Sequence, residues 1–185
     1  MSQTELPTTE GGFRTVVADP PWPYNDRLPG KGRGAAKHYG LMDVDAISAL
    51  PVADVAADAA HLYVWTTNGF LGEAIAVCRA WGFDPKTVLT WVKVSRAGNV
   101  RIGMGRTFRN ATEHAVFGVR GKLPALRRDV PNVFFAERTE HSRKPDRFYE
   151  IVRSMSPGPY LELFARRHEP DFVAWGDEAP RSDLG

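Results

Sequence analysis

The sequence predicts an α/β domain with a mixed, mostly parallel sheet flanked by helices. Short runs rich in β-branched and aromatic residues alternate with segments of helical periodicity, which is typical of strands connected by helices. The chain has 185 residues, of which 43% are hydrophobic, enough for one substantial core but few for two. We therefore expect one domain over residues 1–185, with an ordered core at about 13–178 and poorly anchored ends.

Seven segments are predicted to be strands, because each is a short apolar run enriched in β-branched or aromatic residues. They are Phe13–Ala18, Leu62–Thr66, Thr87–Val94, Ala115–Val119, Val133–Ala136, Tyr160–Ala165 and Phe172–Trp175. Their alternation with helical segments favours parallel pairing over most of the sheet.

Three segments are predicted to be helices. Apolar residues of Phe70–Trp81 fall on one helical face. A second helix opens near Pro145, and its apolar residues recur at i, i+3, i+4 and i+7 over Phe148–Met155. A shorter helix is expected to begin at Asp43, a good N-cap residue, and to end before Pro51.

Three loops stand out between these elements: 25–37, 95–107 and 137–143. The first two are rich in glycine and basic residues, so they could order on a ligand, or they could be plain surface connections. Between Lys93 and Arg128 there are nine basic residues and one acid, although the net charge of the chain is only +2. This distribution suits phosphate contacts, while the preference for arginine over lysine could equally reflect a GC-rich genome.

The cysteine content and the N-terminal residues indicate a cellular compartment. The single cysteine, Cys78, excludes a disulfide framework and a multi-cysteine zinc site. The first twelve residues have neither a basic head nor an apolar run, and no stretch reaches membrane-spanning length. We therefore expect a soluble cytoplasmic protein with no membrane partner.

The strongest local signal is Asp19-Pro20-Pro21-Trp22, which follows an apolar strand. Ligands bind at strand ends in open α/β sheets, and two prolines make a rigid turn without N–H donors. Asp19 and the Pro20 carbonyl could accept the two hydrogens of an exocyclic amine on a nucleobase, while Trp22 stacks on the ring. On these four residues alone, a strand-to-turn connection with a buried tryptophan stays open.

Further motifs follow at Tyr39-Gly40-Leu41-Met42, Trp91-Val92-Lys93, 103–110 and Glu113-His114. With Asp19–Trp22 they resemble the N6-adenine methyltransferase family typified by the catalytic subunit of the eukaryotic mRNA adenosine methyltransferase, and more closely its compact bacterial and phage members. The resemblance implies a class I methyltransferase (Rossmann-like) fold with seven or eight strands, and S-adenosylmethionine as cofactor. It also implies a bacterial or phage-encoded protein of the cytoplasm.

The resemblance also implies the residues of the site. The catalytic residues would be Asp19, Pro20, Pro21 and Trp22. The cofactor would be bound by Asp19, Lys144, Glu162, Phe164, Arg166, His168, Asp177 and Glu178, and the substrate by Tyr24, Tyr39, Arg109 and Glu113. A cation at a helix N-terminus is a reasonable anion site for Lys144, and Glu162 could hold a ribose diol while Phe164 packs against adenine.

Two features depart from the family pattern. The predicted cofactor strand, Tyr160–Ala165, lacks the Gly-x-Gly loop usual in methyltransferases, an absence that the family tolerates. Glu169 stands where the eukaryotic enzyme has asparagine, and Asp177-Glu178 replaces an amide pair. These acids could accept ribose hydroxyls or could weaken cofactor binding.

Several residues allow more than one interpretation. Glu113 could be a salt-bridge partner of Arg109 or a pocket residue, and His114 could be buried and hydrogen-bonded or catalytic. The remaining candidates are treated as structural. His38, His61 and His141 are expected to be surface or cap residues with no metal-binding spacing, and Trp65, Trp81 and Trp91 to be core residues.

The predicted function is methyl transfer to the N6 of a flipped or unpaired adenine in DNA or RNA. The alternatives are a catalytically inactive, nucleic-acid-binding scaffold subunit of a methyltransferase complex, and N4-cytosine methylation. The possible partners are a second copy of the chain or a methyltransferase partner subunit. The apolar face of Leu41, Val44 and Ile47 could support self-association, although packing in the core explains it equally well.

Overall fold

The computed structural model of the chain describes residues 5–23, 42–103, 105, 107–138 and 143–176. The strands are β1 Phe13–Ala18, β2 Ala56–Thr66, β3 Asp84–Val94, β4 Thr112–Arg120, β5 Val133–Glu137, β6 Tyr160–Leu163 and β7 Phe172–Trp175. The helices are α1 Val44–Ser48, α2 Val52–Val55, the short 3-10 helix η2 Asn68–Phe70, α3 Leu71–Ala80 and α4 Asp146–Met155. None of the helices in this described part has the length and apolar run needed to cross a membrane.

All seven strands join one sheet in the order β5-β3-β4-β2-β1-β6-β7. The pairs β1–β2, β1–β6, β3–β5 and β6–β7 are parallel, whereas β4 is antiparallel to both β2 and β3. The prediction of a mixed, mostly parallel sheet is therefore confirmed. Because β1 leads to β2 on one side and pairs with β6 on the other, the carboxyl ends of β1 and β6 lie at a switch point where ligands bind in such sheets.

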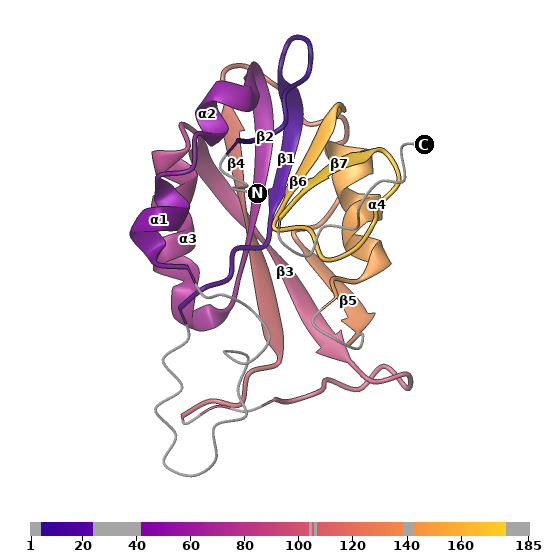
Figure 1. Cartoon of the computed structure of the whole chain (residues 1–185). Helices are drawn as coiled ribbons and strands as arrows, with labels where there is room; N and C mark the ends of the chain where they lie inside the picture. The colour runs from indigo at the N-terminus through magenta and orange to yellow at the C-terminus, as the bar shows by residue number, and fades with distance from the viewer. Residues whose placement is uncertain (1–4, 24–41, 104, 106, 139–142, 177–185) are drawn as a thin grey trace.

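Helices cover both faces of the sheet. In Figure 1, α1, α2 and α3 lie on one side of the central strands and α4 lies on the other. Val16 and Ala18 of β1 join the core beneath α3, and Val17 joins the core beneath α4. Successive strand residues face opposite sides of a sheet, so β1 is buried on both faces. The catalytic candidates thus follow a strand that is buried on both faces.

Some element boundaries differ from the predictions. β2 begins at Ala56, before the predicted Leu62, because the alanine-rich run 56–61 pairs with β1 and β4 although its own strand propensity is low. β6 ends at Leu163, before the predicted Ala165, because Phe164 takes a φ of 60° and leaves the strand conformation. The helix α2 was not predicted.

The predicted short helix is present as α1. Asp43 is its N-cap and accepts a hydrogen bond from the Asp45 amide at 3.4 Å. Ile47 is completely buried in the core beneath α3, and Val44 packs against the same cluster. Core packing therefore accounts for these two residues, while Leu41 lies outside the described residues.

The prediction that His61 is a surface or cap residue is wrong. His61 is completely buried on β2. Its Nε2 lies 3.0 Å from the Leu123 carbonyl oxygen and its Nδ1 lies 2.8 Å from Ser156 Oγ, which also contacts the Tyr63 hydroxyl at 2.7 Å. Since a carbonyl can only accept, Nε2 carries the proton and Nδ1 accepts from Ser156. Burial lowers the pKa of His61. Trp65, Trp81 and Trp91 are core residues, as predicted.

Candidate functional site

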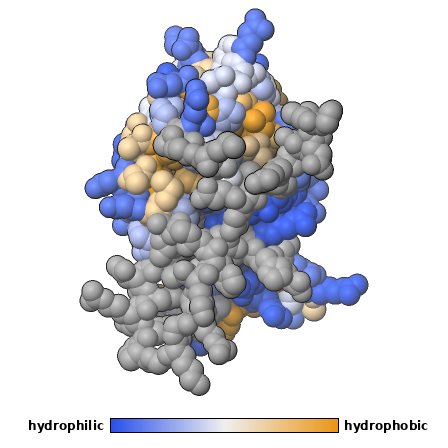
Figure 2. Space-filling model, in the orientation of Figure 1, coloured by the Kyte–Doolittle hydropathy of each residue, from blue (hydrophilic) through white to orange (hydrophobic). Residues whose placement is uncertain are grey.

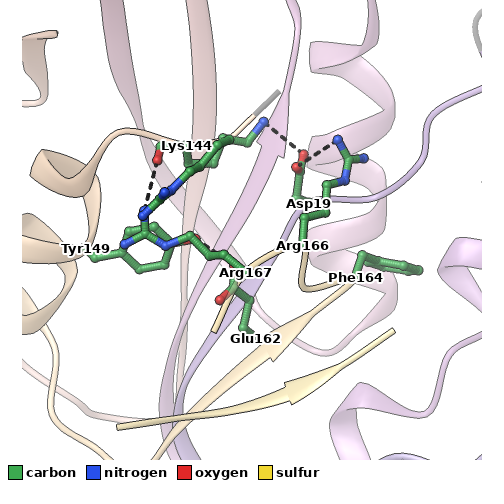
Figure 3. A pocket seen from close by; sticks show the side chains of 8 residues that line it. Asp19, Lys144, Tyr149, Glu162, Phe164, Arg166 and Arg167 are labelled. Carbon is green, nitrogen blue, oxygen red and sulfur yellow. Dashed lines mark hydrogen bonds and ion pairs between the residues drawn. The ribbon is translucent and has the colours of Figure 1, made fainter. Parts of the chain in front are cut away.

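A pocket that is partly open to solvent lies at the carboxyl ends of β1 and β6. Its lining residues are Asp19, Arg143, Lys144, Tyr149, Glu162, Phe164, Arg166 and Arg167. In the close view, Tyr149 and Arg167 lie on one side of Asp19 and Phe164 lies on the other (Figure 3). The structure thus brings together five predicted site residues from segments far apart in the sequence.

Asp19 occupies the end of β1 between two cations. Its backbone amide donates to the Leu163 carbonyl oxygen at 3.3 Å, which ties the end of β1 to β6. Its carboxylate lies 3.1 Å from Lys144 Nζ and 3.7 Å from an Arg166 guanidinium nitrogen, as the dashed lines of Figure 3 show. The Asp19 side chain is only 15% exposed, so these cations offset the cost of removing its charge from water.

Lys144 bridges two acidic side chains. Its ammonium lies 3.1 Å from Asp19, 3.4 Å from Glu113 Oε2, and 4.7 Å from the centre of the Trp65 ring. Burial by itself would lower the pKa of Lys144, but the carboxylates of Asp19 and Glu113 outweigh it and raise this pKa above its ordinary value. Lys144 therefore remains a fixed positive charge in the pocket.

Glu113 pairs with two lysines, so of its two interpretations the salt bridge with Arg109 is not found. Besides Lys144, it contacts Lys93 Nζ at 2.7 Å. Burial would raise the pKa of Glu113, but Lys144 and Lys93 outweigh it and lower the pKa. Arg109 instead donates from Nε to the Gly103 carbonyl oxygen at 2.6 Å, in the segment between β3 and β4.

Glu162 lies on β6 in a different environment. It is 4% exposed, and its Oε1 accepts a hydrogen bond from the Tyr149 hydroxyl at 2.6 Å. Its Oε2 is buried and has no hydrogen-bond partner among the described residues. Burial raises the pKa of Glu162 to about 7, although the Tyr149 hydrogen bond acts in the opposite direction. A buried, unpartnered carboxyl oxygen beside a pocket is a place for a hydroxyl donor from a ligand.

Phe164 enters the pocket through an uncommon backbone conformation. Its φ of 60° lies in the left-handed region, which non-glycine residues seldom adopt outside constrained sites. Gly176 packs against it so closely that a Cβ there would lie 2.9 Å from the Phe164 Cα. The Phe164 ring meets the edge of Trp175 at 5.6 Å and is half-buried, which leaves apolar surface at the pocket.

The turn after Asp19 differs from its prediction in two ways. The Pro20 carbonyl accepts from the Trp22 amide at 2.9 Å, and the Pro21 carbonyl accepts from the Met42 amide at 3.0 Å, so neither is without a competing amide. The Trp22 ring is 2% exposed and stacks on Phe70 at 5.6 Å. Its Nε1 donates to the Trp65 carbonyl at 2.9 Å. The prediction that Trp22 offers a free face to a base is therefore not met in this structure, because the core beneath α3 encloses the ring.

The remaining predicted residues are not among those that line this pocket, or they lie outside the described residues. His168 is exposed and is not among the pocket-lining residues. His114 is hydrogen-bonded through Nδ1 to Thr90 at 3.1 Å and through Nε2 to Asn68 at 2.9 Å. The residues outside the described part are Tyr24, Tyr39, Asp177 and Glu178, together with His38 and His141.

Three pocket residues were missed by reasoning from the sequence: Arg143, Tyr149 and Arg167. Arg143 and Arg167 are adjacent in the chain to the predicted Lys144 and Arg166, and this adjacency could have indicated them. Tyr149 shares the buried face of α4 with Phe148, so its position on an amphipathic helix could have indicated it. In the view of Figure 2, hydrophilic residues are found at the top and at both edges of the molecule, the right-hand edge among them.

Comparison with known proteins adds the family. Residues 13–178 match the MT-A70 family, and the chain belongs to that family. Its relatives include the N(6)-adenosine-methyltransferase MT-A70-like protein of Drosophila melanogaster, 32% identical over 92% of this chain and 28% of that protein. The human N(6)-adenosine-methyltransferase catalytic subunit METTL3 is 29% identical over 91% of this chain and 28% of its own length.

A relative of similar size is the type II methyltransferase M.MunI of a Mycoplasma species, 28% identical over 93% of this chain and 80% of that protein. By contrast, the chain spans little more than a quarter of the two animal relatives. Membership of the family confirms the predicted Rossmann-like methyltransferase fold, which the seven-stranded sheet also displays.

Proposed function

We propose that this protein is an S-adenosylmethionine-dependent methyltransferase that modifies the N6 of adenine in nucleic acid. One observation carries the proposal: a single pocket holds the Asp19 carboxylate, a buried Lys144 cation and the unpartnered Glu162 Oε2. Lys144 offers a site for an anion, Glu162 offers an acceptor for a hydroxyl group, and Asp19 offers an acceptor for an amine. The names of the two animal relatives support the same reaction, and the name of the Mycoplasma relative supports methyl transfer.

The pocket residues fit the cofactor. Lys144 at the start of α4 would meet the carboxylate of its methionine portion, and Glu162 Oε2 would accept a ribose hydroxyl. Phe164 would pack against its adenine, with Arg166 beside Asp19 at the same site. His168, Asp177 and Glu178 stay in the proposal as further contacts. The cofactor supplies the electrophilic methyl carbon when it is bound.

The residues around the turn would orient the target amine. Asp19 and the Pro20 carbonyl would accept its two hydrogens; the carbonyl has a second lone pair besides the one used by the Trp22 amide. Because Trp22 is enclosed, its contribution in this structure is to brace the turn. Tyr24, Tyr39 and Glu113 are proposed to border the target base, and no covalent enzyme intermediate is needed.

Nucleic acid would approach along the segment between β3 and β4, residues 95–111, which we call the arm. Figure 1 shows its described residues, 95–103, 105 and 107–111, extending beyond the sheet from the end of β3 and returning to β4. Arg96, Arg101 and Arg109 are exposed on it, as is Phe108 at 87%, and the arm contains no acidic residue. Arginines suit phosphate contacts, and an exposed aromatic ring suits stacking with unpaired bases. A partner subunit or a second copy of the chain could complete this surface.

The test is methyl transfer from labelled S-adenosylmethionine to matched single-stranded and duplex DNA and RNA, followed by nucleoside analysis. We expect N6-methyladenine on at least one polymer, and a loss on the order of 100-fold or more in Asp19→Asn, which keeps the side-chain volume but removes the charge. Asp129→Asn is the matched control, because Asp129 pairs with Arg127 on the surface. Cofactor binding without transfer to any of the four polymers would favour the inactive scaffold instead.

A further inference from the structure

Arg167 connects the two ends of the pocket. One guanidinium nitrogen donates to Asp146 Oδ1 at 2.6 Å and to the Lys144 carbonyl oxygen at 3.5 Å, at the start of α4. The guanidinium carbon lies 4.4 Å from the centre of the Tyr149 ring, and the Tyr149 hydroxyl donates to Glu162. A single side chain, 13% exposed, therefore contacts the segment that carries Lys144 and the tyrosine that holds Glu162.

Glu169 holds this guanidinium from the opposite side. Its Oε2 accepts from Arg167 Nε at 2.8 Å and from a second Arg167 nitrogen, and its Oε1 accepts from Arg153 at 2.6 Å. The Glu169 side chain is 6% exposed, so this is a buried charge with a partner on each oxygen. Two N–H groups of one guanidinium that converge on a single oxygen, here called the fork, fix the direction of the guanidinium as well as its position.

We propose that Arg167 is a positioning residue that sets the distance between Lys144 and Glu162, and that Glu169 is its buried anchor. The inference rests on the proposed cofactor site, because it assigns these residues to the geometry of that site. It also gives Glu169 a role different from both sequence interpretations: its oxygens are engaged by arginines instead of facing a ribose. Glu169 would then affect cofactor affinity through Arg167, without touching the cofactor itself.

The informative variant is Arg167→Lys, which keeps the positive charge but cannot make the fork, the Asp146 contact and the Tyr149 stack together. Arg147→Lys is the matched control, because Arg147 lies on α4 and pairs with Glu150 on the surface at 2.8 Å. Glu169→Gln is a second variant of the same pair. It keeps the side-chain volume and serves if Arg167→Lys does not fold, as judged by circular dichroism.

The first readout needs no cofactor. Lys144 is 12% exposed, so its acetylation by a small reagent should be slow in the wild-type protein and can be followed by mass spectrometry. We expect acetylation to be about tenfold faster in Arg167→Lys and Glu169→Gln, because a misplaced segment exposes the amine, and unchanged in Arg147→Lys. Equal rates in all four proteins would overturn the inference.

The second readout is calorimetric binding of S-adenosylhomocysteine. We expect about tenfold weaker binding in Arg167→Lys, and a clearly smaller effect of the same change in a Lys144→Met background, since residues acting through one another are not additive. If the effects of Arg167→Lys and Lys144→Met were fully additive, or if Arg167→Lys bound the ligand as tightly as the wild type, the inference would be overturned but the proposed function would stand. Wild-type protein that does not bind the ligand would overturn the proposed function and with it the role of Arg167 in cofactor binding.

Discussion

The two ends of the pocket hold carboxyl groups in opposite electrostatic surroundings. At the β1 end, Asp19 lies between Lys144 and Arg166, in contact with the charge of each. At the β6 end, Glu162 is buried against the Tyr149 hydroxyl, and burial raises its pKa to about 7. The comparison teaches that neighbours, not residue type, decide what a carboxyl group can do here. The first end is a network of charges, and the second is a group that changes its protonation near neutral pH.

Lys144→Met should produce the largest effect, because it breaks the network at the residue shared by Asp19 and Glu113. We expect S-adenosylhomocysteine binding to weaken by about 2–3 kcal/mol, the usual contribution of a hydrogen bond to a charged group. Lys93→Met is the matched control, since Lys93 contacts Glu113 from the other side and does not line the pocket. Calorimetry of both variants checks this, and equal losses would contradict a special role for Lys144.

Glu162→Gln tests the other end through the pH dependence of stability. The pKa of Glu162 is raised from 4.5 to about 7 in the folded protein. At Glu162 the folded state therefore binds more protons than the unfolded state between these values, so the contribution of Glu162 to stability should fall as pH rises from about 4.5 to 7. Glutamine cannot lose a proton, so Glu162→Gln should gain up to on the order of 3 kcal/mol relative to the wild type at pH 8.

Urea unfolding at pH 5, 6, 7 and 8 measures this difference. The glutamine oxygen can still accept the hydrogen bond from the Tyr149 hydroxyl, so the stability difference between the two proteins does not include the loss of that bond. Parallel pH profiles for the two proteins would show that Glu162 is not the group responsible. In the wild type, binding of S-adenosylhomocysteine should also strengthen as pH rises through about 7, because the ionised carboxylate is the better acceptor.

His61 should have the smallest effect on stability, and its pH dependence should be opposite to that of Glu162. Its pKa is lowered by burial in the folded protein, so the folded state resists protonation. Its contribution to stability is complete above the ordinary pKa of 6.5 and is lost as pH falls below that value. We expect the free energy of unfolding of the wild type, relative to that of His61→Gln, to be lower at pH 5.5 than at pH 7. Thermal unfolding checks this, with His168→Gln as the exposed control; identical slopes in His61→Gln and wild type would exclude His61.

Much of the fold followed from local patterns in the sequence. β1 and β7 have the predicted bounds, and α3 and α4 lie where their apolar periodicity indicated. Periodicity is readable because a strand or an amphipathic helix shows its buried face within a few residues of chain. The rule that ligands bind at strand ends also directed attention to Asp19, which the structure places in the pocket.

Only the tertiary structure decided which side chains meet. Glu113 pairs with Lys93 and Lys144 instead of Arg109, and the Trp22 ring is enclosed by the core instead of facing the pocket. The sequence likewise could not show that β4 runs against its neighbours or that Arg167 and Glu169 form a buried pair. The physical reason is that local patterns determine which face of an element is buried, whereas partners come from distant segments through sheet order and packing.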